Sequence, residues 1–102
     1  MELNPNDLPH TSVYKILIGT VLPRPIGWIS SLSPAGQPNL APYSFFNAVC
    51  PKPPTVLFCP NVRGSDGAQK DTLRNVRATG EFVVNIVSEP LAHAMNLTSV
   101  EL

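Results

Sequence analysis

Residues 24–31 of the chain read Arg24-Pro25-Ile26-Gly27-Trp28-Ile29-Ser30-Ser31. Proline biases the residue before it toward extended backbone, and the aromatic and β-branched residues that follow are typical of a strand. We therefore expect a strand over residues 26–33. The next four residues, Pro34-Ala35-Gly36-Gln37, combine a proline and a glycine as hairpin turns do. A second strand is predicted over residues 39–49, bent at Pro42, because proline cannot donate a hydrogen bond to the strand ladder.

The remaining segments alternate between strand-like and helical patterns. A third strand is expected over residues 55–59, and the segment 81–87 predicts another. Between them, a helix is expected over residues 72–78, with Asp71 as its N-cap and Gly80 just beyond its end. A further helix begins over residues 91–97, whereas residues 13–18 fit either a short helix or a strand. This order favours an antiparallel barrel or sandwich over a doubly wound parallel sheet.

Composition limits the class of protein. The chain has 102 residues, which allows one domain at most, and its 43% hydrophobic content is too high for a disordered chain. Its net charge is zero, so it lacks the basic surface that nucleic-acid binding requires. We expect neither a membrane span nor a signal peptide, and hence a cytoplasmic protein. Only 14% of the residues are charged, against about 25% in ordinary domains, so a partner subunit, a further segment of chain or a cofactor is expected to cover part of the surface.

The residues most often used in metal and redox sites give little here. Cys50 and Cys59 lie among apolar residues and are expected to be two small buried side chains, with a single disulfide as the alternative. His10 and His93 are far apart in sequence and have no carboxylate or thiol at the spacing of metal ligands. No pattern for a catalytic triad or a Walker loop is present, so no protein catalytic residue is predicted.

The segment Lys70-Asp71-Thr72 follows a loop and opens the predicted helix. Free N–H groups at a helix start favour anions, and a lysine and a threonine hydroxyl there suit a phosphate. Arg63, in the preceding loop, is within reach of the same group. The alternative is ordinary capping by Asp71, with Lys70 and Thr72 solvated.

Two further segments carry polar and aromatic residues that suit a planar ring. The stretch Asn39-Leu40-Ala41-Pro42-Tyr43-Ser44-Phe45-Phe46-Asn47 places Ser44 and Asn47 beside two phenylalanines, which could line a ring pocket or simply be core residues beside a turn. Trp28 either fills the core or stacks on a ring, with the core favoured. The hydroxyls of Ser30 and Ser31 are candidate donors to phosphate or ribityl groups.

Together, the segments 24–31, 39–47, 70–75 and 82–85 resemble, in order and spacing, the flavin reductase-like family. These are FMN-binding split β-barrel proteins that include flavoredoxins. The resemblance covers residues 23 to about 98 and implies a mainly β, antiparallel Greek-key split barrel with one or two short helices. It also implies non-covalent FMN, NADH or NADPH as the electron donor, and a homodimer with the flavin near the subunit interface.

The resemblance also assigns residues to the cofactor. Its phosphate end falls to Ser30, Ser31, Lys70 and Thr72, and the residues along the flavin are Asn39, Leu40, Ala41, Ser44 and Phe46. Because the flavin carries out the redox chemistry, no protein general base is expected.

The chain is shorter than usual members of the family, so residues 1–102 are interpreted as one FMN-binding domain of this type that lacks its later strands. A half barrel leaves open strand edges that another chain must pair. The alternative to an oxidoreductase is a non-catalytic flavin-binding or assembly module. A peptide-binding domain is a weaker third possibility, suggested only by the exposed edges and the prolines.

Overall fold

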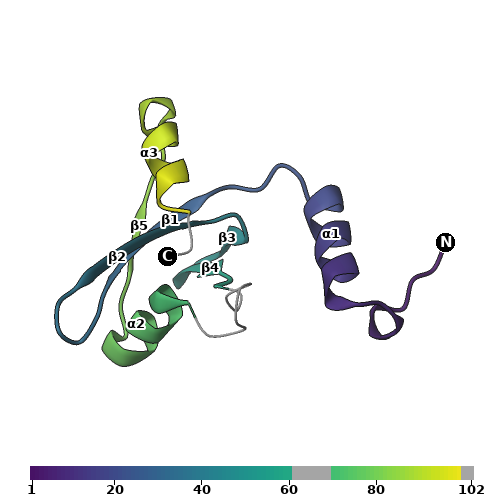
Figure 1. The fold of residues 1–102 in the computed structure, drawn as a ribbon, viewed down its shortest axis with the longest axis horizontal. Helices are drawn as coiled ribbons and strands as arrows, with labels where there is room; N and C mark the ends of the chain where they lie inside the picture. The colour runs from purple at the N-terminus through teal and green to yellow at the C-terminus, as the bar shows by residue number, and fades with distance from the viewer. Residues whose placement is uncertain (61–69, 100–102) are drawn as a thin grey trace.

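The computed structural model describes residues 1–60 and 70–99, so Arg63 lies outside the described residues. Three α-helices and five strands are present in these ranges, together with two 3-10 turns (Figure 1). In chain order the elements are η1 (Pro5–Asp7), α1 (His10–Thr20), β1 (Gly27–Leu32), β2 (Pro38–Tyr43), β3 (Phe46–Pro51), β4 (Pro54–Phe58), α2 (Asp71–Thr79), β5 (Val83–Asn85), η2 (Glu89–Leu91) and α3 (Ala92–Leu97).

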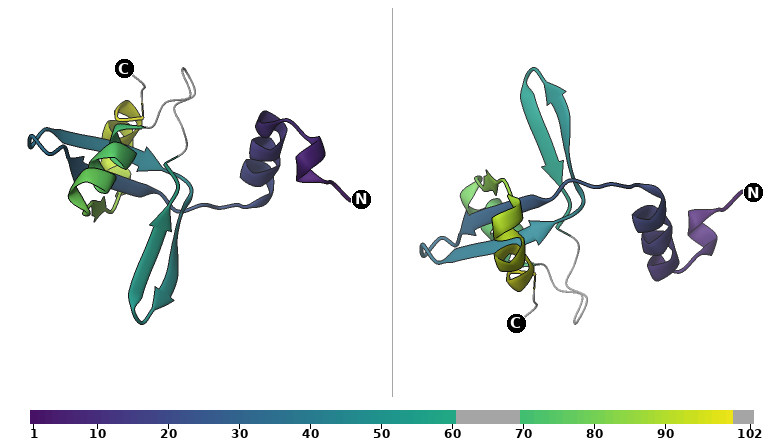
Figure 2. Two further views of the ribbon diagram at one scale, coloured as in Figure 1. Left: turned by 90° about the horizontal axis from the view of Figure 1, so that it is seen from below. Right: turned by 90° about the horizontal axis from the view of Figure 1, so that it is seen from above.

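The strands form two separate antiparallel sheets. One has three strands in the order β2-β1-β5, and the other is the β3–β4 ribbon. In the first sheet Ile29 of the central strand lies between Ala41 of β2 and Val84 of β5. Figure 2 shows the ribbon projecting away from the three-stranded sheet, with α1 on a long connection at the side. The predicted antiparallel class is confirmed, although there are three α-helices rather than one or two.

The turn between β1 and β2 forms where the sequence predicts it. Gly36 has a φ of +85°, a conformation that suits a residue without a Cβ. Its N–H donates to the Ser33 carbonyl at 2.8 Å, and the Ser33 hydroxyl accepts from the Gln37 N–H at 3.0 Å. These local bonds fix the register in which Ser31 lies opposite Asn39.

The prediction of one long strand over residues 39–49, bent at Pro42, is wrong. Pro42 continues β2 and pairs with Trp28, and the chain changes sheet two residues later, at Ser44 and Phe45. β2 is an edge strand, where the missing proline N–H is tolerated. The strand predicted over residues 81–87 is also shorter, because only Val83–Asn85 pair with β1.

The helices settle two questions that the sequence left open or answered incorrectly. Residues 10–20 form α1, so the ambiguous N-terminal segment is a helix. At α2, Lys70 rather than Asp71 occupies the N-cap position, and no side chain caps the helix. Asp71 is instead the first helical residue and pairs with Arg74 one turn later. Gly80 ends the helix as predicted, with a φ of +75° and its N–H bonded to the Val76 carbonyl at 2.8 Å.

A small core lies between α2 and the three-stranded sheet. Ile29 is fully buried there and Tyr43 is nearly so, with three buried polar side chains (Ser31, Thr72 and Asn75) beside them. Trp28 is also buried, but on the opposite face of β1, where its indole N–H donates to Thr98. The expectation that Trp28 belongs to the core is confirmed. Both thiols are free, so the alternative of a disulfide is not realised, but the expectation that both are buried is wrong, since Cys50 is half-buried and Cys59 is exposed. Cys59 follows the end of β4, in a two-stranded ribbon that has no second layer over it.

Candidate functional site

A polar network joins α2 to the sheet. The Asn39 side-chain amide donates to the Thr72 hydroxyl at 2.9 Å, and the Asn75 amide donates to the Ser31 hydroxyl at 3.1 Å. Thr72 and Asn75 are three residues apart and share one helix face, while Ser31 and Asn39 are cross-strand partners on one sheet face. Three of the four residues in this network (Ser31, Asn39 and Thr72) were predicted as site residues from the sequence, and the structure brings them together. The interpretation of Thr72 as a solvated residue is wrong, because only 1% of it is exposed.

Tyr43 ends β2 on the same face and was not among the predicted site residues. It is 5% exposed, and the Lys70 ammonium lies over its ring at 5.3 Å from the centroid. Burial raises the pKa of the Tyr43 hydroxyl above 10.0, and a hydrogen bond from Thr72 opposes that effect. Side chains alternate between the two faces of a strand, so Asn39, Ala41 and Tyr43 share one face. This alternation was the sequence signal that could have placed Tyr43 at the site.

The opposite face of the sheet holds Ser30 and Leu40. The Asn85 amide donates to the Trp28 carbonyl at 3.0 Å and to the Ser30 hydroxyl at 3.2 Å. The Trp28 indole N–H donates to the Thr98 hydroxyl at 3.0 Å, which ties the end of α3 to this face. Ser30 and Ser31 thus belong to different polar groups on opposite faces of β1, although the family resemblance assigns both to one end of a ligand.

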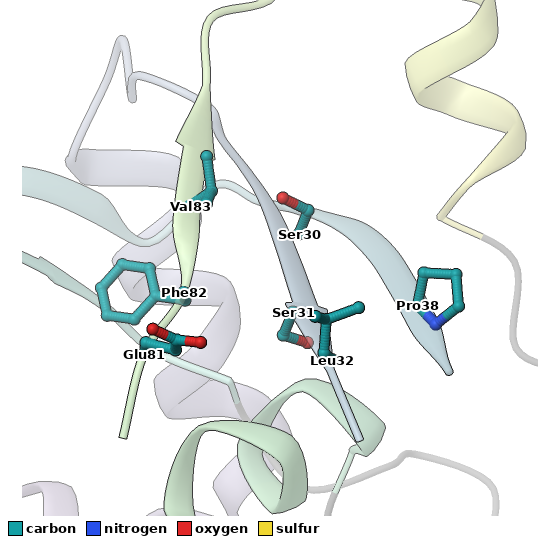
Figure 3. A pocket seen from close by; sticks show the side chains of 7 residues that line it. All are labelled: Ser30, Ser31, Leu32, Pro38, Glu81, Phe82 and Val83. Carbon is teal, nitrogen blue, oxygen red and sulfur yellow. The ribbon is translucent and has the colours of Figure 1, made fainter. Parts of the chain in front are cut away.

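A hollow of about 440 Å³ lies between the ends of β1, β2 and β5 (Figure 3). Figure 3 shows the Ser31 hydroxyl reaching toward α2 and Ser30 pointing away from that helix. The exposed side chains of Leu32 and Val83 make much of this wall apolar. This hollow suits an apolar body that meets the Ser30 hydroxyl at its edge.

A second, smaller cavity brings together two predicted residues from distant segments. Lys70 and Ser44 both line a space of about 120 Å³, with Tyr43, Phe45 and Cys59 also in its wall. Ser44 also lines an adjoining groove of about 310 Å³, where Phe46 and Arg24 contribute. The Arg24 guanidinium lies 5.7 Å from the centroid of the Phe45 ring and donates to the Ile18 and Val21 carbonyls at the end of α1.

Residues 1–60 and 70–99 contain no group of three or more His, Cys, Asp or Glu side chains placed to hold a metal ion. No helix within these ranges is both long and apolar enough to cross a bilayer.

The flavin reductase like domain matches residues 18–101, which is most of the chain. The chain belongs to the flavin reductase-like family. It is 44% identical to a Halalkalibacterium halodurans protein over 100% of this chain and 48% of the relative, and 44% identical to an Aquifex aeolicus protein over 99% and 51%. The chain therefore spans about half the length of these curated relatives.

Solved structures agree with this family and with the split barrel. Nitrilotriacetate monooxygenase component B from Bacillus cereus is 38% identical, with a TM-score of 0.88 over 99% of this chain and 50% of that chain. The 2-nitrobenzoate 2-nitroreductase NbaA of Pseudomonas fluorescens is 33% identical, with a TM-score of 0.80 over 100% and 48%. A Shewanella frigidimarina protein with a split barrel domain, 18% identical, has a TM-score of 0.72 over 100% and 50% and shows the fold alone. The split-barrel class predicted from the sequence is confirmed, and the described residues contribute open sheets rather than a closed barrel.

Proposed function

We propose that the protein is an FMN-binding oxidoreductase that passes electrons from NADH or NADPH to flavin, or through bound FMN to an acceptor. Membership of the flavin reductase-like family supports this function. So do the names of two similar structures, a monooxygenase component and a nitroreductase, since both kinds of protein take part in redox reactions. We further propose a homodimer with the flavin near the subunit interface.

The observation that carries the proposal is the cavity in which Lys70 and Ser44 meet at the start of α2. No side chain caps α2, so the positive end of the helix dipole, the Lys70 ammonium and the Ser44 hydroxyl together form a donor set that suits a phosphate. The Thr72 hydroxyl is buried between Asn39 and Tyr43, and it therefore serves to fix α2 on the sheet rather than to face the ligand. Of the residues predicted to bind the phosphate, Lys70 is the charged one that lines a cavity among the described residues.

The remaining predicted residues divide by position. Ser44 and Phe46 line the groove next to this cavity, and we assign them to the flavin ring. Asn39 and Ser31 hold α2 on the sheet through their hydrogen bonds to Thr72 and Asn75. The flavin supplies the redox chemistry when it is bound, and the chain's own residues bind it, orient it and exclude water from it.

The test compares FMN with riboflavin, which lacks the phosphate. Lys70→Ala is expected to weaken FMN binding about tenfold or more, because a charge-assisted hydrogen bond is lost, and to leave riboflavin binding unchanged. The matched control is Lys52→Ala, which removes an exposed lysine from the β3–β4 turn. Titration by quenching of flavin fluorescence measures both constants. Equal weakening of the two ligands excludes a phosphate contact at Lys70, and no quenching by the unaltered protein refutes flavin binding.

A non-catalytic flavin-binding or assembly module is the second candidate. It is favoured by exposed apolar side chains on one face of the three-stranded sheet, such as Leu32, Leu40 and Val83, which suit contact with another polypeptide. Steady oxidation of NADH or NADPH that depends on added FMN excludes this candidate. FMN binding without such turnover supports it.

A further inference from the structure

Tyr43 forms a platform beneath the Lys70 side chain. The ammonium lies over the aromatic face at 5.3 Å from the centroid, within the range in which a cation is attracted to an aromatic ring. Tyr43 is buried, whereas Lys70 is only partly buried at the N-cap of α2. The ring therefore offers a dry surface to a cation whose other side remains open to a ligand.

The platform is itself held on two sides. The Tyr43 hydroxyl lies beside the Thr72 side chain, whose hydroxyl accepts from the Asn39 amide at 2.9 Å. The ring packs against Phe58 with centroids 5.2 Å apart, and Phe58 meets Phe82 edge-on at 4.9 Å. Lysine is a long, flexible side chain that loses rotamer entropy when a ligand immobilises it. A fixed aromatic surface reduces that loss because it restricts the ammonium before the ligand arrives.

We propose that Tyr43 is a positioning residue whose ring holds the Lys70 ammonium at the cavity and thereby sets the preference for phosphorylated over unphosphorylated flavin. This inference rests on the proposed FMN-binding function. Tyr43 acts through Lys70, so its effect is confined to ligands that carry the phosphate. The ring provides the effect, and the hydroxyl serves only to orient the ring.

Two substitutions separate the ring from the hydroxyl. Tyr43→Phe retains the aromatic face and is expected to keep the ratio of riboflavin Kd to FMN Kd within twofold of the unaltered protein. Tyr43→Leu removes the face and is expected to lower that ratio by about two- to fivefold, the range of an ordinary cation–π contact. In a Lys70→Ala background the same Tyr43→Leu change should leave the ratio unchanged, because no ammonium remains to be positioned. A ratio unaffected by Tyr43→Leu in the presence of Lys70 overturns the inference, even if FMN binds.

A measurement on the unaltered protein guards against misfolding of the leucine variant. The chain has three lysines, so selective labelling resolves the ε-methylene protons of Lys70 from those of the exposed Lys15 and Lys52. Stacking over Tyr43 is expected to shift the Lys70 protons upfield relative to the other two, and Tyr43→Phe should preserve the shift. Lys70 protons that resonate with those of Lys15 and Lys52 refute the platform. This result does not depend on flavin binding, so it distinguishes failure of the inference from failure of the proposed function.

Discussion

Gly27 is the position where the smallest substitution should have a large effect. A Cβ added at this residue would lie 2.6 Å from Cδ1, 2.8 Å from Cγ and 3.2 Å from Cβ of Phe46. Carbon atoms in contact are normally 3.5–4.0 Å apart, so the Phe46 ring must retreat by about 1 Å. A change of χ2 would move Cδ1 but would leave Cγ and Cβ in place, so rotation of the ring about χ2 alone does not relieve the clash. Gly27→Ala should therefore destabilise the fold by about 1–3 kcal/mol, the usual cost of overpacking.

Urea denaturation followed by Trp28 fluorescence measures this loss. With an m-value of about 1–3 kcal/mol/M for a small protein, the midpoint should fall by about 1 M. Gly19→Ala is the matched control, because a Cβ there meets no atom within 4 Å and alanine favours a helix by up to about 1 kcal/mol. Adding Phe46→Ala should remove most of the penalty at Gly27, so the two changes should be strongly non-additive. A midpoint for Gly27→Ala equal to or above that of Gly19→Ala would refute the reasoning.

Three further outcomes are expected. The pKa of Tyr43 is raised in the folded protein, so at alkaline pH the folded protein keeps a proton that the unfolded chain releases. This contribution to the free energy of unfolding is complete below pH 10 and is lost at higher pH, by at most about 1.4 kcal/mol per pH unit. Urea titrations at several alkaline pH values should show that Tyr43→Phe lessens this loss. Asn75→Ala should reduce the free energy of unfolding by about 1–3 kcal/mol, since it leaves the buried Ser31 hydroxyl without its donor, and a double-mutant cycle with Ser31→Ala should reveal the coupling. Gly80→Ala should lower the free energy of unfolding by about 1 kcal/mol, measured by thermal denaturation, because a φ of +75° strains a residue with a Cβ. A loss of no more than about 0.2 kcal/mol, roughly the error of such a measurement, contradicts this account.

The features that the sequence predicted well are those set by neighbouring residues. The β1–β2 turn depends on the chemistry of four consecutive residues, and the end of α2 depends on Gly80. The break after Tyr43 was missed because it arises from long-range pairing. Phe46 pairs with Phe58 of β4, and nothing within residues 39–49 specifies that partner.

The candidate site was predicted only in part for a related reason. The four motifs pointed to segments that the structure brings together, but the resemblance did not say which side chains share a face. Strand alternation separates Ser30 from Ser31, and helix spacing brings Asn75 beside Thr72; both are derivable from the period of each element. The stacking of Lys70 on Tyr43 joins the last residue of a strand to the N-cap of a distant helix, and only the three-dimensional arrangement reveals it.

The three-stranded sheet and the β3–β4 ribbon should differ in how easily they open locally. β1 is paired on both sides and covered by α2, so exposure of its amides to exchange requires disruption of the core. In the ribbon, β3 and β4 pair only with each other, so each strand has one unpaired edge. The side chains of Val49, Val56 and Leu57 in the ribbon are exposed. Isolated two-stranded ribbons are marginal in water, and here ring contacts through Phe58 attach the ribbon to Tyr43 and Phe82. Two rings therefore attach the ribbon to the rest of the fold, Phe58 through Tyr43 and Phe82, and Phe46 through Gly27 of β1. Release of both should let the ribbon amides exchange while the three-stranded sheet stays folded.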